Sequence, residues 1–196
     1  MPHLLYQHRV NTLGELAGLP PGLGVELDLR SSGDDVIVTH DPFTEGVGIE
    51  EYFPRIGARP CIFNIKCEGI EPRVLALAKQ HGIEQFFLLD CSVPAAVKLW
   101  RSGERRFAVR WSEYEPLEGV LAWAGKAHWC WVDCFRSFPS DQQAWAQVAK
   151  HFAICLVSPE LQGHAGSTLS ALRAQVAGRD FSAVCTKRPE LWQERA

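Results

Sequence analysis

The sequence predicts an α/β fold in which eight parallel strands alternate with helices and close into one barrel. Three observations support this prediction. Eight short apolar runs recur along the 196 residues, segments of helical spacing separate many of them, and no linker or low-complexity tract divides the chain. A chain of this length with 46% hydrophobic residues can bury a full core, so we expect a single domain, residues 1–196.

The predicted strands are the eight apolar runs. They are His3–Gln7, Gly24–Arg30, Cys61–Lys66, Gln85–Asp90, Phe107–Trp111, His128–Asp133, Phe152–Val157 and Ser182–Thr186. One stretch after the second run is different. Residues 34–41 follow a Ser31-Ser32-Gly33 turn, and we expect them to fold back over the barrel mouth and deliver His40.

The predicted helices are segments whose apolar residues recur at helical spacing. They are Glu71–His81, Val93–Arg101, Glu115–Trp123, Asp141–Lys150 and Thr168–Ala177. The residues expected at helix ends are the N-caps Ser140-Asp141 and Ser167-Thr168 and the terminating glycines Gly82, Gly103 and Gly178. The alternation favours a compact (β/α)8 TIM barrel over an open doubly wound sheet, and no glycine-rich phosphate loop follows any strand.

Charge and composition argue against several classes of function. The formal net charge is -3 and no basic run occurs, so we expect no nucleic-acid partner. No apolar stretch approaches the roughly 20 residues that cross a bilayer, and we see no secretory signal. The seven cysteines lie mostly in apolar runs, which is typical of reduced cysteines in a cytoplasmic protein. Cys130 and Cys134 lack a second ligand pair, which favours core packing over a metal site.

Two carboxylates lie on the second predicted strand. Glu26 and Asp28 are two residues apart, so they point to the same face, while the apolar residues between and beside them point to the other. Two inward like charges are costly unless something neutralises them. A divalent metal near the end of the strand would do so; the alternative is that both pair with Arg30, Arg110 or Lys66.

The third predicted strand repeats this geometry. Asn64 and Lys66 point inward and towards the barrel mouth, and a buried lysine is seldom tolerated without a charged partner. Lys66 could neutralise a phosphate in the transition state. The alternative is an ion pair with Glu26 or Asp90.

Two histidines and an arginine complete the set. His8 ends the first strand, Arg9 follows it, and His40 precedes Asp41. Loops after the carboxyl ends of strands are where barrel enzymes build their sites. Two histidines can act as an acid and base pair near neutral pH, and an arginine matches a phosphate. Together with the carboxylates they indicate phosphodiester chemistry assisted by a metal.

In these residues the chain resembles the glycerophosphodiester phosphodiesterase family, within the superfamily of phospholipase C-like phosphodiesterase barrels. The matching motifs are His8-Arg9, Asn11-Thr12, Glu26-Leu27-Asp28, His40-Asp41, Asn64-Ile65-Lys66 and Thr186-Lys187-Arg188-Pro189. The match is strong over residues 7–43, weaker over 61–66 and 182–192, and elsewhere little more than barrel-like.

Three departures from the family pattern stand out. The glycine usual after the His-Arg pair is Val10, and the third-strand glutamate that binds metal in the family is Asn64. An amide oxygen can still bind a cation, but the site loses one negative charge and should hold the metal more weakly. Residues 44–60 form a much shorter stretch than the usual insertion, so a substrate other than a glycerophosphodiester is an open alternative.

The resemblance implies hydrolysis of a small phosphodiester. It assigns His8 and His40 as the catalytic acid and base, Arg9 and Lys66 to phosphate binding, and a cation, Mg²⁺ or Ca²⁺, to Glu26, Asp28 and Asn64. The first nucleophile would be a substrate hydroxyl, with a cyclic phosphate as intermediate. Two alternatives remain: a barrel that has lost activity and serves as a binding module, and a sugar-phosphate isomerase or lyase. The sequence leaves the oligomeric state open.

Overall fold

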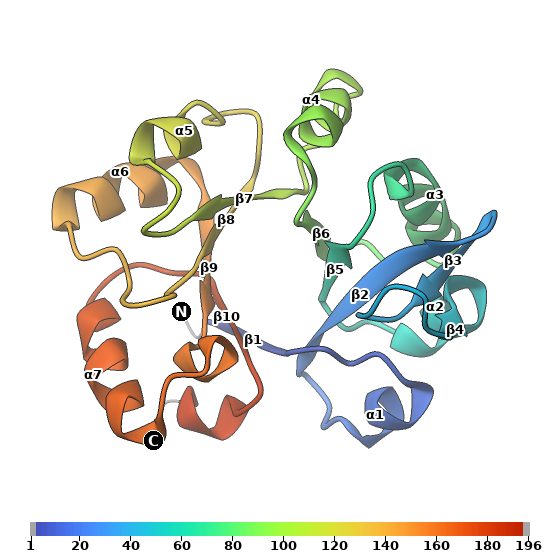
Figure 1. Cartoon of the computed structure of the whole chain (residues 1–196), viewed down its shortest axis with the longest axis horizontal. Helices are drawn as coiled ribbons and strands as arrows, with labels where there is room; N and C mark the ends of the chain where they lie inside the picture. The colour runs from blue at the N-terminus through green and yellow to red at the C-terminus, as the bar shows by residue number, and fades with distance from the viewer. Residues whose placement is uncertain (1–2, 194–196) are drawn as a thin grey trace. The chain divides into compact units, whose positions relative to one another are not determined.

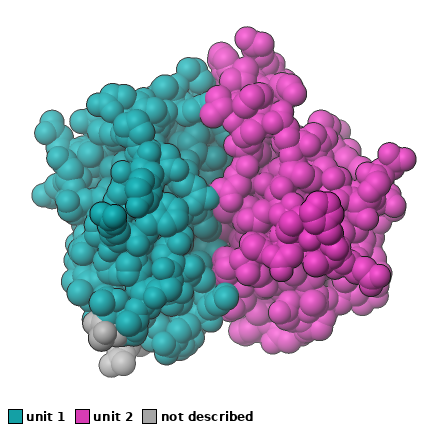
Figure 2. All heavy atoms as spheres, viewed as in Figure 1, with its two compact units in different colours: residues 1–5, 105–196 teal, residues 6–104 magenta. Residues whose placement is uncertain are grey.

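The computed structural model describes residues 3–193, apart from the side chain of Ser167. The chain divides into two compact units (Figure 2): the described residues of Met1–Leu5 and Arg105–Ala196 form unit 1, and Tyr6–Glu104 form unit 2. The single domain expected from the sequence stays a prediction.

Unit 2 contains the amino-terminal strands and helices (Figure 1). Its elements, which begin with a strand shared with unit 1, are β1 (Leu4–Gln7), α1 (Leu13–Gly18), β2 (Gly24–Ser32), β3 (Asp35–Val38), β4 (Val47–Gly48), α2 (Ile49–Ile56), β5 (Cys61–Ile65), α3 (Glu71–Gln80), β6 (Phe86–Leu89) and α4 (Val93–Arg101). Strand β2 pairs in parallel with β1 and β5, and β5 pairs in parallel with β6. Strand β3 turns back and pairs antiparallel with β2.

Unit 1 contains the carboxyl-terminal half of the chain. Its elements are β7 (Ala108–Trp111), α5 (Leu117–Leu121), β8 (Trp129–Val132), α6 (Gln142–His151), β9 (Ala153–Val157), the 3-10 helix η1 (Pro159–Gln162), α7 (Gly166–Val176), β10 (Ala183–Thr186) and η2 (Pro189–Leu191). Strands β7 to β10 pair in sequence order, all in parallel, and α5, α6 and α7 lie along one side of them (Figure 1). The amide of Leu4 in β1 donates to Ser182 at the start of β10, 2.9 Å away.

The predicted strand pattern is confirmed. Each of the eight predicted runs contains a strand, and the parallel path runs β6-β5-β2-β1-β10-β9-β8-β7, which is the sequential order of a (β/α)8 barrel. The five predicted helices are also present, with ends within a few residues of those expected. Closure between the two edge strands, β6 and β7, stays a prediction.

The expected helix ends are partly correct. Asp141 caps α6, and its Oδ1 accepts the amide hydrogen of Ala144 at 2.8 Å. The three terminating glycines all adopt a positive φ, which glycine tolerates without strain. The N-cap predicted at Ser167-Thr168 is wrong, because α7 already begins at Gly166 with Ala165 as its cap.

The cysteines behave as packing residues. Among the described residues no disulfide joins any of the seven, and five of them are buried. Cys130 and Cys134 are both fully buried, and the Cys134 thiol donates to the carbonyl of Val157 at 3.3 Å, which confirms core packing for this pair. Within residues 3–193, no helix has the length and apolar character needed to cross a membrane. The expected cytoplasmic location stays a prediction.

Candidate active site

The site is built on β2. Because side chains alternate along a strand, Glu26, Asp28 and Arg30 share one face, while Val25 and Leu27 are fully buried on the other. Both carboxylates are only 1% exposed. A buried pair of like charges needs donors or cations close by, and the neighbouring strands supply them.

The loop after β1 brings donors to Glu26. Arg9 adopts a φ of 56°, unusual for a residue with a side chain, and its amide donates to Glu26 Oε2 at 2.6 Å. The imidazole Nε2 of His8 lies 3.8 Å from the same oxygen. The next residue, Val10, is tied down on both sides: its amide donates to the backbone oxygen of Glu26 and its carbonyl accepts from the Tyr52 hydroxyl, at 2.8 and 2.6 Å.

Asp28 is held from three sides. Asn11 donates from Nδ2 to Asp28 Oδ2 at 2.8 Å, and its own Oδ1 accepts the Asp28 amide hydrogen at 3.0 Å. The guanidinium Nε of Arg9 lies 3.7 Å from Oδ2, and the ammonium of Lys66 lies 3.3 Å from Oδ1. Of the predicted alternatives, the ion pair of Lys66 with Asp90, at 3.8 Å, is confirmed, and so is its pairing with Asp28; among the described residues no ion pair joins Lys66 to Glu26.

The adjacent strand β5 places Asn64 directly opposite Asp28 in the parallel register. Its Nδ2 donates to Glu26 Oε1 at 2.9 Å. Its Oδ1 is buried and has no hydrogen-bond partner among the described residues. A buried amide oxygen without a donor is rare in folded proteins and calls for an explanation.

His40 reaches the site through the β2–β3 hairpin. The register pairs Leu29 with Val38, and the next amide, that of Thr39, donates to the Asp28 carbonyl at 3.0 Å. The fold-back predicted for this stretch is therefore confirmed. His40 Nδ1 lies 2.7 Å from Asp41 Oδ1. A carboxylate only accepts, so Nδ1 carries the hydrogen of this bond.

The electrostatics follow from burial. Burial and the neighbouring Asp28 carboxylate raise the pKa of Glu26 to about 7, against the hydrogen bonds from Asn64 and Arg9. At the exposed edge of the cluster the effect is opposite, because the hydrogen bond from His40 lowers the pKa of Asp41. A carboxylate whose pKa is raised by burial and by a neighbouring like charge is a frequent mark of a functional site.

The same cluster offers oxygens of the kind that a hard divalent cation binds. These are the carboxylates of Glu26 and Asp28 and the unpartnered Oδ1 of Asn64. Among residues 3–193 no group of three His, Cys, Asp or Glu side chains could hold a metal. The three oxygens are of a type that fits a hard cation, and the expected metal stays a prediction.

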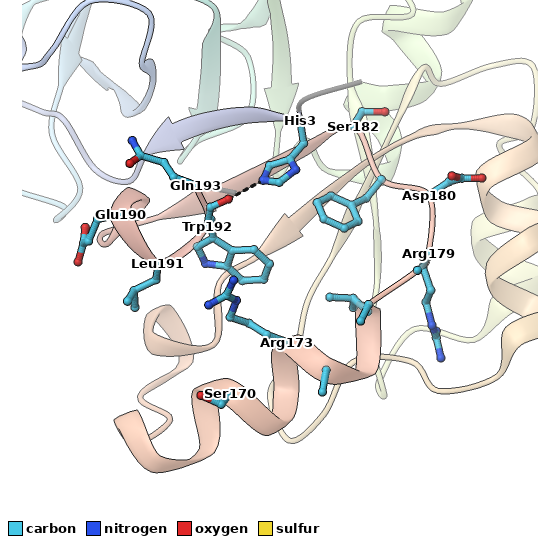
Figure 3. Close-up of a pocket in the computed structure, with 15 residues that line it drawn as sticks. His3, Ser170, Arg173, Arg179, Asp180, Ser182, Glu190, Leu191, Trp192 and Gln193 are labelled. Atoms are coloured by element: carbon cyan, nitrogen blue, oxygen red, sulfur yellow. Dashed lines mark hydrogen bonds between the residues drawn. The ribbon is translucent and has the colours of Figure 1, made fainter. Parts of the chain in front are cut away.

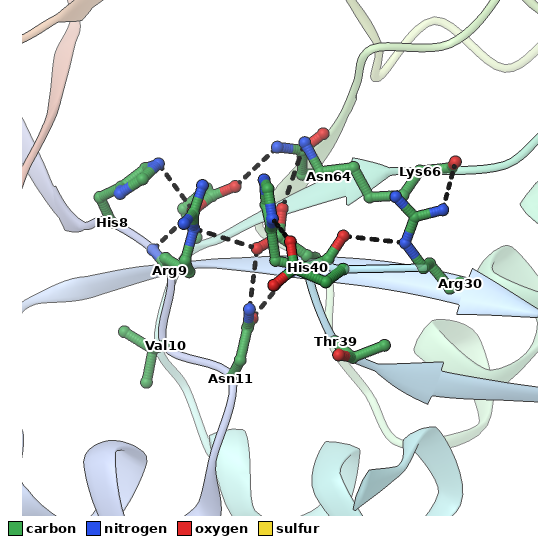
Figure 4. A network of polar contacts seen from close by, with 12 residues as sticks. His8, Arg9, Val10, Asn11, Arg30, Thr39, His40, Asn64 and Lys66 are labelled. Atoms are coloured by element: carbon green, nitrogen blue, oxygen red, sulfur yellow. Dashed lines mark hydrogen bonds and ion pairs between the residues drawn. The ribbon is translucent and has the colours of Figure 1, made fainter. Parts of the chain in front are cut away.

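Figure 4 shows the labelled side chains of His8, Arg9, His40, Asn64 and Lys66 gathered at one place in unit 2. The predicted residues are thus brought together; their roles stay predictions. Sequence reasoning gave no separate role to Asn11, and it named Arg30 and Asp90 only as possible ion-pair partners within the cluster. Both Asn11 and Arg30 could have been found from the sequence. Asn11 belongs to the Asn11-Thr12 motif, and Arg30 continues the alternation that places Glu26 and Asp28 on one face of the strand.

A separate hollow lies in unit 1 (Figure 3), and none of the predicted site residues lines it. His3, Arg173 and Trp192 are among its walls, and His3 Nε2 lies 3.0 Å from the carbonyl of Trp192. It adjoins the amino-terminal ends of β1 and β10. In this class of fold that end serves stability, whereas chemistry is found at the carboxyl-terminal ends.

No protein-family model and no curated protein matches the chain. The solved structures that match it include two crystal structures from Agrobacterium tumefaciens strain C58. One is described as a glycerophosphoryl diester phosphodiesterase, with a TM-score of 0.72 and 16% identity over 98% of this chain and 96% of that one. The other is a glycerophosphodiester phosphodiesterase, with a TM-score of 0.69 and 17% identity over 97% and 98%. Both cover nearly the whole chain, so the predicted TIM-barrel fold and the resemblance in fold are confirmed.

Proposed function

We propose that the chain is a phosphoric diester hydrolase that cleaves a small phosphodiester of the glycerophosphodiester type. The observation that carries the proposal is the convergence of His8, Arg9, His40 and Lys66 on the two buried carboxylates of β2. The fold shared with two phosphodiesterases supports it. Fold alone does not determine chemistry, so the argument depends on the side chains.

The proposed acid and base are His8 and His40. One takes the proton of the attacking hydroxyl as its oxygen bonds to phosphorus, and the other gives a proton to the leaving alcohol as its bond to phosphorus breaks. Asp41 fixes the tautomer of His40, and Glu26 lies 3.8 Å from His8. Both imidazoles are partly exposed, 17% for His8 and 35% for His40, so a ligand can reach them.

The proposed phosphate ligands are Arg9 and Lys66. Each lies beside Asp28, which orients it while leaving further donors on the guanidinium and the ammonium. Positive charge held in place before the reaction stabilises the negative charge that develops on the phosphate oxygens. Because the Arg9 side chain is 41% exposed and Lys66 only 18%, we expect Arg9 to meet the substrate first.

We propose Mg²⁺ or Ca²⁺ as the cofactor, held by Glu26, Asp28 and Asn64. When bound, such a cation polarises the phosphate and lowers the pKa of the attacking hydroxyl. The nucleophile we favour is a hydroxyl of the substrate itself, followed by hydrolysis of a cyclic phosphate. The same residues would then act in both steps. In the second step, the hydrolysis of the cyclic phosphate, His8 and His40 would exchange their roles as acid and base.

One observation favours a second function, that of a binding module without turnover. Asn64 occupies one oxygen of Glu26 with an N–H, and the Lys66 ammonium occupies one oxygen of Asp28. A cluster neutralised from within needs no metal and could hold a phosphodiester without cleaving it. A barrel of this kind would bind the ligand through Arg9 and Lys66.

Hydrolysis of a nitrophenyl phosphodiester separates the two functions. The parent is assayed with Mg²⁺, with Ca²⁺ and with a chelator, beside a His8→Ala, His40→Ala double variant purified in the same way. We expect turnover by the parent, stimulated by metal, and none by the double variant. Equal rates in both would point to a contaminant, and binding without turnover under every condition would establish the binding module instead.

A further inference from the structure

Arg30 is a charged residue that the proposed mechanism does not use. It is the third member of the inward row on β2, two residues after Asp28, and is only partly exposed. Its hydrogen bonds do not go to the carboxylates beside it. Among the residues that the structure describes, they go to two backbone carbonyls.

The two carbonyls belong to residues of the proposed machinery. Nε of Arg30 donates to the carbonyl of His40 at 2.8 Å, and Nη1 donates to the carbonyl of Lys66 at 3.2 Å, both visible in Figure 4. These residues stand on separate segments, one after the β3 hairpin and one after β5. A planar guanidinium with donors in a fixed fork sets the separation and angle of the two groups it joins.

Both segments leave their strands at this point. The β2–β3 ladder ends at the pair Leu29 and Val38, so His40 lies beyond it. The β2–β5 register ends at Leu29 and Ile65, and one further bond, from the Lys66 amide to the Leu29 carbonyl at 2.9 Å, follows it. Through its two hydrogen bonds, Arg30 therefore connects β2 to His40 and Lys66, which lie just beyond the ends of the two ladders.

We infer that Arg30 is a positioning residue, which fixes His40 relative to Lys66. This inference rests on the proposed function for its catalytic consequence but not for its structural one. Misplacing a catalytic group by about 1 Å can cost roughly 100-fold in rate. The effect should fall on kcat, since the residue joins backbone segments and is assigned no contact with the substrate.

The test uses Arg30→Lys and Arg30→Met in the full chain. Lysine keeps the charge but offers a single ammonium, which cannot reproduce the fork. Arg59→Lys is the matched control, because Arg59 also donates to backbone carbonyls, those of Leu19, Pro20 and Leu23, within the same unit. We expect both Arg30 variants to lose roughly 10- to 100-fold in kcat with KM little changed, and the control to keep kcat.

A second measurement does not depend on turnover. Backbone NMR order parameters of residues 39–44 should fall towards about 0.6 in both Arg30 variants and stay near the rigid value in the control. If Arg30→Lys restores kcat, or if only KM rises, Arg30 acts through its charge and the inference is overturned. If the parent is inactive the proposed function fails, and unchanged order parameters then overturn the positioning role by themselves.

Discussion

The strand ends of the two units use buried carboxylates in opposite ways. In unit 1, Asp133 follows β8, is fully buried, and accepts hydrogen bonds from Arg110 Nη1, Gln162 Nε2 and the Cys134 amide. In unit 2, Glu26 and Asp28 lie two residues apart, and the neighbouring Asn64 keeps an oxygen without a partner. Asp133 stands alone with an arginine beside it, whereas Glu26 and Asp28 repel each other even though each of their oxygens has a donor or cation close by.

Glu160 in unit 1 repeats the first pattern. It accepts from the hydroxyls of Ser158 and Thr186 and from the amide of Lys187. A carboxylate at the carboxyl end of a barrel strand is thus no mark of function by itself. The feature particular to unit 2 is a pair of neighbouring buried carboxylates beside an amide oxygen that has no donor among the described residues. Like charges held together and a missing donor both leave capacity for a cation.

The histidines give the largest expected contrast. His8→Ala and His40→Ala should each lower kcat by roughly 100- to 10,000-fold, the usual range for general acid–base catalysis. The double variant should be little worse than either single one, since residues that act as a unit are not additive. Steady-state kinetics and the pH profile of the parent, expected to be bell-shaped, are the measurements.

The matched control is His164→Ala in unit 1. His164 Nε2 lies 2.7 Å from the carbonyl of Cys134, so this histidine also stands near a strand end and contacts the backbone. We expect kcat to be unchanged in this variant. Near-parental turnover in both His8→Ala and His40→Ala would rule out the acid–base assignment.

Removing the partner of Asp133 should cost stability rather than activity. Arg110→Met leaves a buried carboxylate with one charged partner fewer, and breaking such a pair typically costs about 4 kcal/mol of unfolding free energy. Arg73→Met is the control, since Arg73 pairs with Asp35 and Glu50 on the surface, where ion pairs contribute about 1 kcal/mol or less. Chemical denaturation measures the free energy of unfolding of both variants. Equal losses in Arg110→Met and Arg73→Met would show that the buried pair of Arg110 and Asp133 stabilises the fold no more than a surface pair does.

The sequence predicts features that depend on residues close together in the chain better than it predicts contacts between distant residues. The eight strands and the fold-back of residues 34–41 follow from local apolar runs and a turn. Two helices were not predicted. Helix α1 carries a capping box between Thr12 and Glu15 but is short, and α2 contains Pro54, which breaks the usual pattern.

The site was predictable in its composition and less so in its contacts. Motif and alternation placed Glu26, Asp28 and Asn64 on one inner face, and the register confirms that placement. The bonds from Arg30 to two backbone carbonyls were not foreseeable, because any residue can present a carbonyl and no side-chain pattern marks it. Long-range pairs of this kind require the tertiary structure.

The burial of Glu26 and its repulsion from Asp28 should be visible as a pH dependence of stability. The pKa of Glu26 is about 7 in the folded chain, above its ordinary value of 4.5, so the folded state binds the proton more tightly. In the presence of a chelator the parent should therefore lose about 3 kcal/mol of unfolding free energy as the pH rises from 4.5 to 7. Glu26→Gln should lack this decline.

Glu45→Gln is the control for that titration, because Glu45 is exposed and should leave the parental curve unchanged. Unfolding by urea at each pH gives the free energies. Parallel curves for the parent and Glu26→Gln would mean that Glu26 does not share a buried site with a second charge.

The substitution Asn64→Glu replaces the unpartnered amide oxygen that distinguishes the carboxylate site of unit 2 from that of unit 1. A carboxylate opposite Asp28 would place a third negative charge where the amide now stands, which adds Coulomb attraction for a cation. We expect Mg²⁺ or Ca²⁺ to bind weakly to the parent, not at all to Glu26→Gln at millimolar metal, and roughly ten-fold or more tightly to Asn64→Glu than to the parent. Calorimetric titration of the metal-free protein measures all three.

The same substitution should change stability in opposite directions with and without metal. Without metal, three buried carboxylates repel one another and the melting temperature should fall; with metal, binding to the folded state should restore it. Asn64→Gln is the control, since it changes the length of the side chain but adds no charge, and it should not tighten binding. If Asn64→Glu binds metal no better than the parent, Asn64 does not face the cation, and the site of unit 2 is neutralised from within, as the carboxylates of unit 1 are.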